Sequence, residues 1–244
     1  ISDISNRSKF IMSEDVIVKI LTHIIDNFNI SFSLIKKLSK YLQEDNEKPN
    51  ITEQEVKFFN AIPFVSNENS LKNNLPITIY RGRITSEKMF LKMTKELEKN
   101  KEVIYKPSSN YSSWTTSLSV AKKFGSIKGY STGANDELGT KDVKTILKTK
   151  LTNENLALDV VFYSNLMYEI DSLLFNRDVL TNPKNPSYED FKQERKKAKN
   201  ILKLNTNEVK LFNFIRNFEN KTVAKNEEEI IVFGKVKIYE VKKL

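Results

Sequence analysis

The chain has 244 residues, of which 39% are hydrophobic and 29% are charged, so it is long enough to bury a sizeable core as one large domain or two small ones. It contains no cysteine and one histidine, which excludes disulfides, thiolate zinc sites and relays of several histidines. Any catalysis must therefore use carboxylates, hydroxyls and arginine. The net charge of +9 favours anionic partners, and no apolar run approaches the roughly 18 residues that a membrane-spanning helix needs.

The N-terminal part of the chain has the pattern of amphipathic helices. After Ser13 the apolar residues follow a three-and-four spacing, at Val16, Ile17, Ile20, Leu21, Ile24, Ile25 and Phe28. A second helix is predicted over residues 33–42. A third begins at Thr52, where Glu55 three residues later completes a capping-box pattern. Residues 1–70 are therefore predicted to form a helical subdomain, and its role stays open between bracing a cleft and docking to a delivery partner.

Beyond Pro76, strands and helices alternate. The pattern predicts a strand over 77–80, a helix over 86–97, a strand over 111–117 and a short helix over 119–124 capped by Ser119. Four of the six glycines then fall within residues 125–139, which predicts a long loop.

The last hundred residues continue this mixture. Strands are predicted over 143–151 and 156–162, followed by a helical stretch to residue 174 and by helices that start at Ser187 and Thr206. Two more strands, over 229–233 and 236–241, end the chain. Helices followed by a mixed half predict an α+β fold in which residues 71–244 form one compact unit.

Three short segments carry the chemistry of a plausible active site. The first places Arg81 at a predicted strand end in Tyr80-Arg81-Gly82, and the second is Thr115-Thr116-Ser117 preceded by Trp114. The third is Glu227-Glu228-Glu229, which opens an apolar strand. Each segment alone is typical of an ordinary surface, strand or turn, so it is their joint occurrence in this order that indicates a function.

Together these segments resemble the arginine, Ser-Thr-Ser and Glu-x-Glu motifs of the mono-ADP-ribosyltransferases, which include secreted bacterial toxins and phage-encoded enzymes. The resemblance covers residues 75–244, and Thr115 departs from it by replacing the first serine of the triplet with another hydroxyl residue. It implies a helical lobe followed by a β-sandwich-like ADP-ribosyltransferase core. It also implies an enzyme that takes NAD as substrate, needs no metal, and hydrolyses NAD as a side activity.

The resemblance assigns the two outer glutamates separate roles. Glu229 would stabilise the positive charge that the ribose develops as nicotinamide leaves. Glu227 would orient the guanidinium of an acceptor, which makes arginine of a target protein the expected acceptor. On a strand these two side chains share a face while Glu228 points away. The register Asn226-x-Glu228 remains an alternative, and it would weaken the inference of an arginine acceptor.

The other motif residues are expected to bind NAD. The resemblance implies that Arg81 holds the pyrophosphate or the adjacent ribose, and that Gly82 lets the main chain approach the nicotinamide. The Thr115 hydroxyl would hold Glu229, while Thr116 and Ser117 shape the cleft. In the glycine-rich segment Phe124 and Lys128 are further candidates for NAD contacts, although Phe124 fits a core position equally well.

Two other readings are kept as alternatives. A basic nucleic-acid-binding or interaction module would make the three segments coincidental, and an enzyme of the same fold could mainly hydrolyse NAD or modify another acceptor. The chain opens at Ile1 without a methionine, so we expect a processed or trimmed chain. The first reading is a monomeric toxin or effector that is secreted and acts in a target-cell cytoplasm. The alternative location is the host bacterial cytoplasm, for a phage-encoded enzyme.

Overall fold

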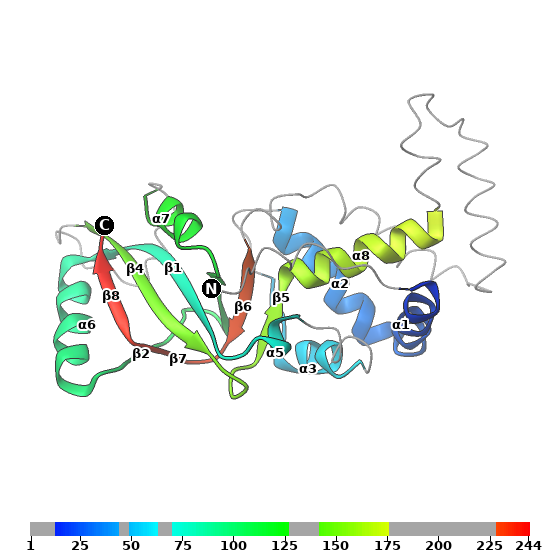
Figure 1. Cartoon of the computed structure of the whole chain (residues 1–244), viewed down its shortest axis with the longest axis horizontal. Coiled ribbons are helices and arrows are strands. Elements are labelled where there is room, and N and C mark those ends of the chain that lie inside the picture. The colour runs from blue at the N-terminus through cyan, green and yellow to red at the C-terminus, as the bar shows by residue number, and fades with distance from the viewer. Residues whose placement is uncertain (1–12, 44–48, 63–69, 127–141, 176–227) are drawn as a thin grey trace, which may run out of the picture. The chain divides into compact units, whose positions relative to one another are not determined.

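The structure is a computed structural model that describes residues 13–43, 49–62, 70–126, 142–175 and 228–244. These residues contain seven helices and eight strands (Figure 1). The chain divides into two compact units, which are described separately below. Helices combine with an antiparallel sheet of six strands, so the α+β class predicted from the sequence is confirmed.

The first unit is helical in its described part. It contains α1 (Glu14–Asp26), α2 (Phe28–Gln43), α3 (Glu53–Ala61) and all but the first residue of α8 (Val160–Phe175). The three-and-four spacing of the sequence corresponds to the buried faces, which include Ile17, Ile20, Leu21 and Ile24 of α1 and Leu34, Ile35 and Leu38 of α2. The second helix starts at Phe28, earlier than predicted, where the stacked rings of Phe28 and Phe32 occupy its first turn.

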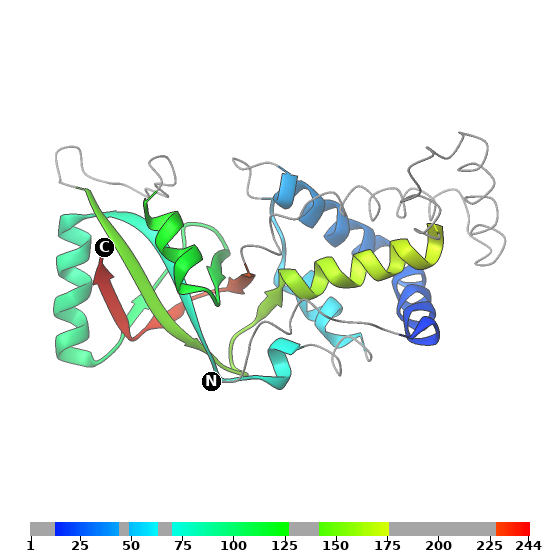
Figure 2. The same ribbon diagram turned by 45° about the horizontal axis from the view of Figure 1, so that its top comes forward.

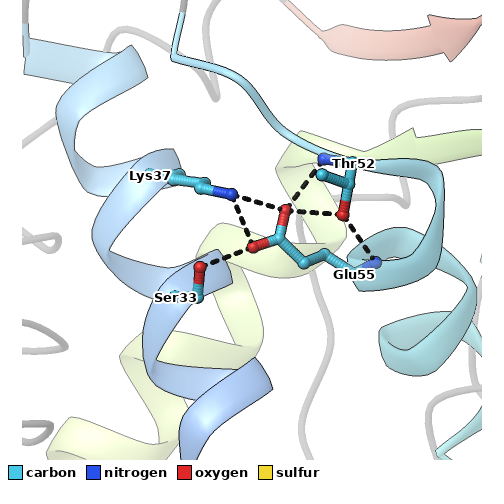
Figure 3. Close-up of polar contacts among 4 residues, drawn as sticks. All are labelled: Ser33, Lys37, Thr52 and Glu55. Carbon is cyan, nitrogen blue, oxygen red and sulfur yellow. Dashed lines mark hydrogen bonds and ion pairs between the residues drawn. The ribbon is translucent and has the colours of Figure 1, made fainter.

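A buried carboxylate connects α2 to the start of α3 (Figure 3). Glu55 and Thr52 form the predicted capping box, in which Glu55 N donates to Thr52 Oγ1 at 3.2 Å and Thr52 N donates to Glu55 Oε2 at 2.8 Å. From α2, Ser33 Oγ donates to Glu55 Oε1 at 2.6 Å, and Lys37 Nζ lies 2.8 Å from the same oxygen. The sequence predicted the cap but not this link to α2.

The Glu55 network predicts a loss of stability in acid. Burial raises the pKa of Glu55, but hydrogen bonds from Lys37, Ser33 and Thr52 outweigh it, so the pKa is lowered from its ordinary value. A carboxyl group whose pKa is lower in the folded state stabilises the fold above its unfolded-state pKa and loses this contribution as pH falls through the folded-state pKa. We expect the wild type to lose more unfolding free energy than Glu55→Gln between pH 6 and the acid limit of folding. Urea unfolding at several pH values measures the two free energies of unfolding. If they fell in parallel as pH decreased, the prediction would be wrong.

The second unit is built on a six-stranded antiparallel sheet in the order β5-β6-β3-β1-β4-β8. Its strands are β1 (Ile77–Ser86), β3 (Tyr111–Thr115), β4 (Asp142–Leu151), β5 (Ala157–Asp159), β6 (Glu229–Phe233) and β8 (Glu240–Lys243). A two-stranded sheet pairs β2 (Val103–Tyr105) with β7 (Val236–Ile238). The helices are α5 (Ser70–Asn73), α6 (Glu87–Asn100) and α7 (Leu118–Ser126) (Figure 2).

The core of this unit draws apolar side chains from both sheets and from α6. One buried cluster includes Ile79, Trp114, Leu147, Ile230, Val236, Ile238 and Met93. The Thr149 hydroxyl of β4 also donates to the Lys237 carbonyl of β7. The aromatic residue of the Thr115 motif, Trp114, is therefore a core residue, and its ring meets Tyr105 edge-on at 6.1 Å between centroids.

Several boundaries differ from the prediction. The run over 236–241 is not one strand, because the chain leaves β7 and enters β8 of the other sheet around Tyr239. The run over 156–162 is a strand only as far as Asp159 and then becomes α8. The hydrophobic pattern could not distinguish strand from helix here, because the first turns of α8 are buried on every side. The first strand runs on to Ser86, and α7 is capped by Ser117, not Ser119, because Val120 N donates to Ser117 Oγ at 3.4 Å.

The division into units also differs from the predicted one at α8. The predicted core ran without interruption over residues 71–244, whereas nearly all of α8 groups with the N-terminal helices. The second unit consists of Ser70–Val160 and Lys225–Leu244. The predicted helices that start at Ser187 and Thr206, and most of the glycine-rich segment, lie outside the described residues.

The residue that caps the C-terminal end of α6 has a backbone conformation that favours glycine, so replacing it with glycine should stabilise the protein. Lys101 caps the helix with φ of 64°, in the left-handed region that costs a side-chain-bearing residue about 1 kcal/mol. We expect Lys101→Gly to raise the free energy of unfolding by roughly 0.5–1 kcal/mol, because glycine adopts this conformation without strain. Chemical denaturation measures the change. The control is Lys99→Gly inside α6, which should destabilise by about 1 kcal/mol, and a loss at both positions would refute the argument.

Candidate active site

One residue of each motif segment, Arg81, Thr115 and Glu229, lies on one of three neighbouring strands, β1, β3 and β6. Tyr80 of β1 is opposite Thr115 of β3, and Thr115 is opposite Glu229 of β6. Directly opposed residues in antiparallel strands project from the same face of a sheet. Tyr80, Thr115 and Glu229 therefore form one row across the sheet.

Glu229 is the first residue of β6, and only 7% of its surface is exposed. Its Oε1 accepts a hydrogen bond from Ser113 Oγ at 2.5 Å. Ser113 lies two residues before Thr115 on β3, so strand alternation places both on the face of Glu229. The sequence analysis predicted Thr115 as the anchor and missed Ser113. Alternation places Ser113 on the same face as Thr115, but which of the two binds Glu229 depends on how β3 pairs with β6.

The predicted triplet itself turns the chain from β3 into α7. Thr115 ends β3, and its Oγ1 accepts from Ser117 N at 3.0 Å. Ser117 Oγ lies 2.8 Å from Ser119 Oγ and accepts from Val120 N at the start of α7. Thr115 thus stands opposite Glu229, while Ser117 fixes the beginning of the helix that follows.

Glu228 lies in the turn before β6, with φ of 48° in the left-handed region. Its Oε2 accepts a hydrogen bond from Thr116 Oγ1. Glu228 was expected to point away from the face of Glu229 by strand alternation, but it precedes the strand, so alternation does not apply to it and its position follows from the contact with Thr116. Glu227 lies outside the described residues, as does Asn226.

Arg81 lies in the middle of β1, not at a strand end as predicted. Its Nη1 donates to the carbonyl oxygen of Ser113, and its guanidinium lies 5.9 Å from the centre of the Tyr105 ring. Arg81 is opposite Leu147, and alternation along β1 directs it away from the face of Tyr80. The structure thus connects Arg81 to the site through the Ser113 main chain, but it places the Arg81 and Glu229 side chains on opposite faces of the sheet.

Gly82 is required by the packing of α7 on β1. A Cβ at this position would overlap the Ala121 carbonyl oxygen and would lie 2.5 Å from Gly125 N. The space beside Gly82, which the resemblance assigned to nicotinamide, is therefore filled by the backbone of α7. Phe124, a candidate for NAD contact, is half-buried in α7, and Lys128 lies outside the described residues.

The environment of Glu229 also affects a neighbouring tyrosine. Burial, assisted by the negative charge of Glu229, raises the pKa of Tyr111 to about 12. Tyr111 shares the β3 face with Ser113, so the carboxylate has an uncharged phenol and a hydroxyl near it. A buried carboxylate held in this way can accept hydrogen bonds and stabilise a positive charge that forms beside it.

Neither a family model, a curated protein nor a solved structure matches the chain. Within the described ranges, no helix combines the length and the apolar composition needed to cross a bilayer. In the same residues, no group of three or more His, Asp or Glu side chains is placed to hold a metal ion. The site must accordingly be interpreted from its own side chains.

Proposed function

We propose that the chain is a mono-ADP-ribosyltransferase that transfers ADP-ribose from NAD to arginine of a target protein. When no target protein is present, it hydrolyses NAD. One observation carries the proposal: Arg81, Thr115 and Glu229 of the three motif segments lie on adjacent strands, and Ser113 holds the buried carboxylate of Glu229 opposite Thr115. In this proposal the second unit is an ADP-ribosyltransferase core, and the protein acts as a toxin or effector, secreted or encoded by a phage.

Glu229 supplies the central catalytic charge in this proposal. Cleavage of the bond between nicotinamide and ribose releases a neutral leaving group and leaves positive charge on the ribose. A carboxylate beside the ribose stabilises this charge, and low solvent exposure strengthens the effect. The Ser113 hydroxyl keeps the carboxylate in place while the charge develops.

In this proposal Arg81 acts on the site through the Ser113 main chain, because its side chain lies on the face of the sheet opposite Glu229. A guanidinium has five N–H donors, and one of them is used on the Ser113 carbonyl. Arg81 Nε is buried with no hydrogen-bond partner among the described residues. The hydrogen bond from Arg81 to the Ser113 carbonyl holds the part of β3 whose Ser113 hydroxyl binds Glu229.

The acceptor is assigned through Glu227. An arginine guanidinium is protonated in water and needs a carboxylate partner before it can attack carbon. The burial of Glu229 and the contact between Glu228 and Thr116 favour the register Glu227-x-Glu229 over Asn226-x-Glu228. Glu227 is then the partner of the acceptor, and Glu229 is the residue at the ribose.

The test is incorporation of labelled ADP-ribose from NAD into bacterial and eukaryotic lysates, with nicotinamide release measured in parallel. We expect labelling by the wild type, faster nicotinamide release with agmatine, and loss of labelling but retained NAD hydrolysis in Glu227→Gln. No labelling and no NAD consumption would overturn the proposal. Steeply salt-sensitive binding to generic DNA or RNA without turnover would instead favour an interaction module.

A further inference from the structure

A pocket lies in the sheet-containing unit, between α7 and strands β1, β4 and β8. The pocket has a volume of about 340 Å³, within the range of small-molecule sites. Its charged lining consists of Lys122, Lys148, Lys242, Lys243 and Glu240. Glu240 binds Lys148 at 2.9 Å and also pairs with Lys242, and the lining thus holds four lysines against one glutamate. The lining therefore keeps an excess of positive charge.

The remaining wall of the pocket is apolar. Leu118 of α7, Ile146 of β4 and the ring of Tyr80 contribute to it. Ammonium groups act as mobile point charges suited to phosphate oxygens, whereas an apolar and aromatic wall suits a flat ring. A simple inorganic anion would contact only the ammonium groups. A nucleotide would contact the ammonium groups through its phosphates and the apolar wall through its base or sugar.

We propose that this pocket binds the diphosphate of a nucleotide, with the lysines around the phosphates and the apolar wall against the rest of the molecule. The diphosphate has two possible sources. It is either the diphosphate of NAD itself, an assignment that rests on the proposed function, or that of a separate nucleoside diphosphate.

The register of the sheet relates the pocket to Glu229. Tyr80, which lines the pocket, is opposite Thr115 on one side and Lys148 on the other, and Lys148 is opposite Glu240. The row that begins at Glu229 therefore continues into the pocket on the same face of the sheet. Lys148 is three strands from Glu229, or about 14 Å at the usual strand spacing. Such a separation is within the span of an extended dinucleotide and also leaves room for a separate ligand.

The test is calorimetric titration with ADP and with inorganic pyrophosphate. We expect ADP to bind the wild type, and the double variant Lys122→Gln/Lys243→Gln to bind it about tenfold more weakly or worse, equivalent to about 1.4 kcal/mol. The control is Lys72→Gln/Lys150→Gln, which removes two exposed lysines outside the pocket and should change the affinity less than about twofold. No ADP binding by the wild type, or equal weakening in both double variants, would overturn the proposal.

A second measurement separates the two sources. If the diphosphate belongs to NAD, NAD displaces ADP and the pocket variant raises KM for NAD with little change in kcat. If it belongs to a separate nucleotide, NAD does not displace ADP and the kinetics with NAD stay the same. ADP binding needs no turnover, so pocket-dependent binding by a chain that never consumes NAD would refute the proposed function and leave the pocket assignment standing.

Discussion

Glu229→Gln is expected to lower the rate of NAD cleavage by about a hundredfold or more while the protein remains folded. The amide has the shape of the carboxylate, and its oxygen can still accept from Ser113 Oγ, so packing at the start of β6 is preserved. What disappears is the negative charge that stabilises the ribose in the transition state. Nicotinamide release under saturating NAD measures the rate, and circular dichroism during heating monitors the fold.

The neighbouring residue provides a matched control for this prediction. Glu228→Gln makes the same chemical change one position earlier, and its amide oxygen can still accept from Thr116 Oγ1. We expect most of the turnover to survive in this variant. A loss as large as that in Glu229→Gln would move the catalytic carboxylate to Glu228 and would remove the support for the Glu227-x-Glu229 register.

Gly82→Ala is expected to destabilise the protein more than any other single methyl addition considered, by about 3 kcal/mol. The new Cβ would overlap the Ala121 carbonyl oxygen and lie 2.5 Å from Gly125 N. Both are backbone atoms of α7, so no side-chain rotation relieves the overlap and the helix must move away from β1. Urea unfolding at neutral pH, compared with the wild type, measures the cost.

Gly234 separates this steric effect from the general cost of replacing glycine. A Cβ at Gly234 meets nothing within 4 Å, but φ is +73°, so Gly234→Ala should cost about 1 kcal/mol of backbone strain. If Gly82→Ala proved no more destabilising than Gly234→Ala, the packing of α7 on β1 would have to be looser than described.

Local signals made the helices predictable. The spacing of Ile17, Ile20, Leu21 and Ile24 fixes the buried face of α1, and Thr52 with Glu55 marks the start of α3 within four residues. The partners of Glu55 on α2 are 18 and 22 positions away, so no local pattern revealed them. The same holds for β7 and β8, since a continuous alternating run cannot show that its two halves join different sheets.

The candidate site was predictable to the same extent. Motifs identified Arg81, Thr115 and Glu229, but the hydrogen-bonding partner of Glu229 depends on the register between β3 and β6, which their sequences do not specify. Ser113 was missed for this reason. The opposite faces of Arg81 and Glu229, and the occupation of the space at Gly82 by α7, are likewise consequences of tertiary packing.

The position of β6 between β5 and β3 has a consequence for the order of folding. Residues 229–243 complete both sheets, since they provide β6 and β8 to the larger one and β7 to the smaller. Ser113 and Glu229 are 116 positions apart, so their contact closes one of the longest loops in the chain. A nascent chain cannot form this contact until β6 has been synthesised. Non-local pairing of this kind is typically slow, so pulse-labelled hydrogen exchange should find the β6 amides protected after those of β1 and β4, which pair over a shorter separation.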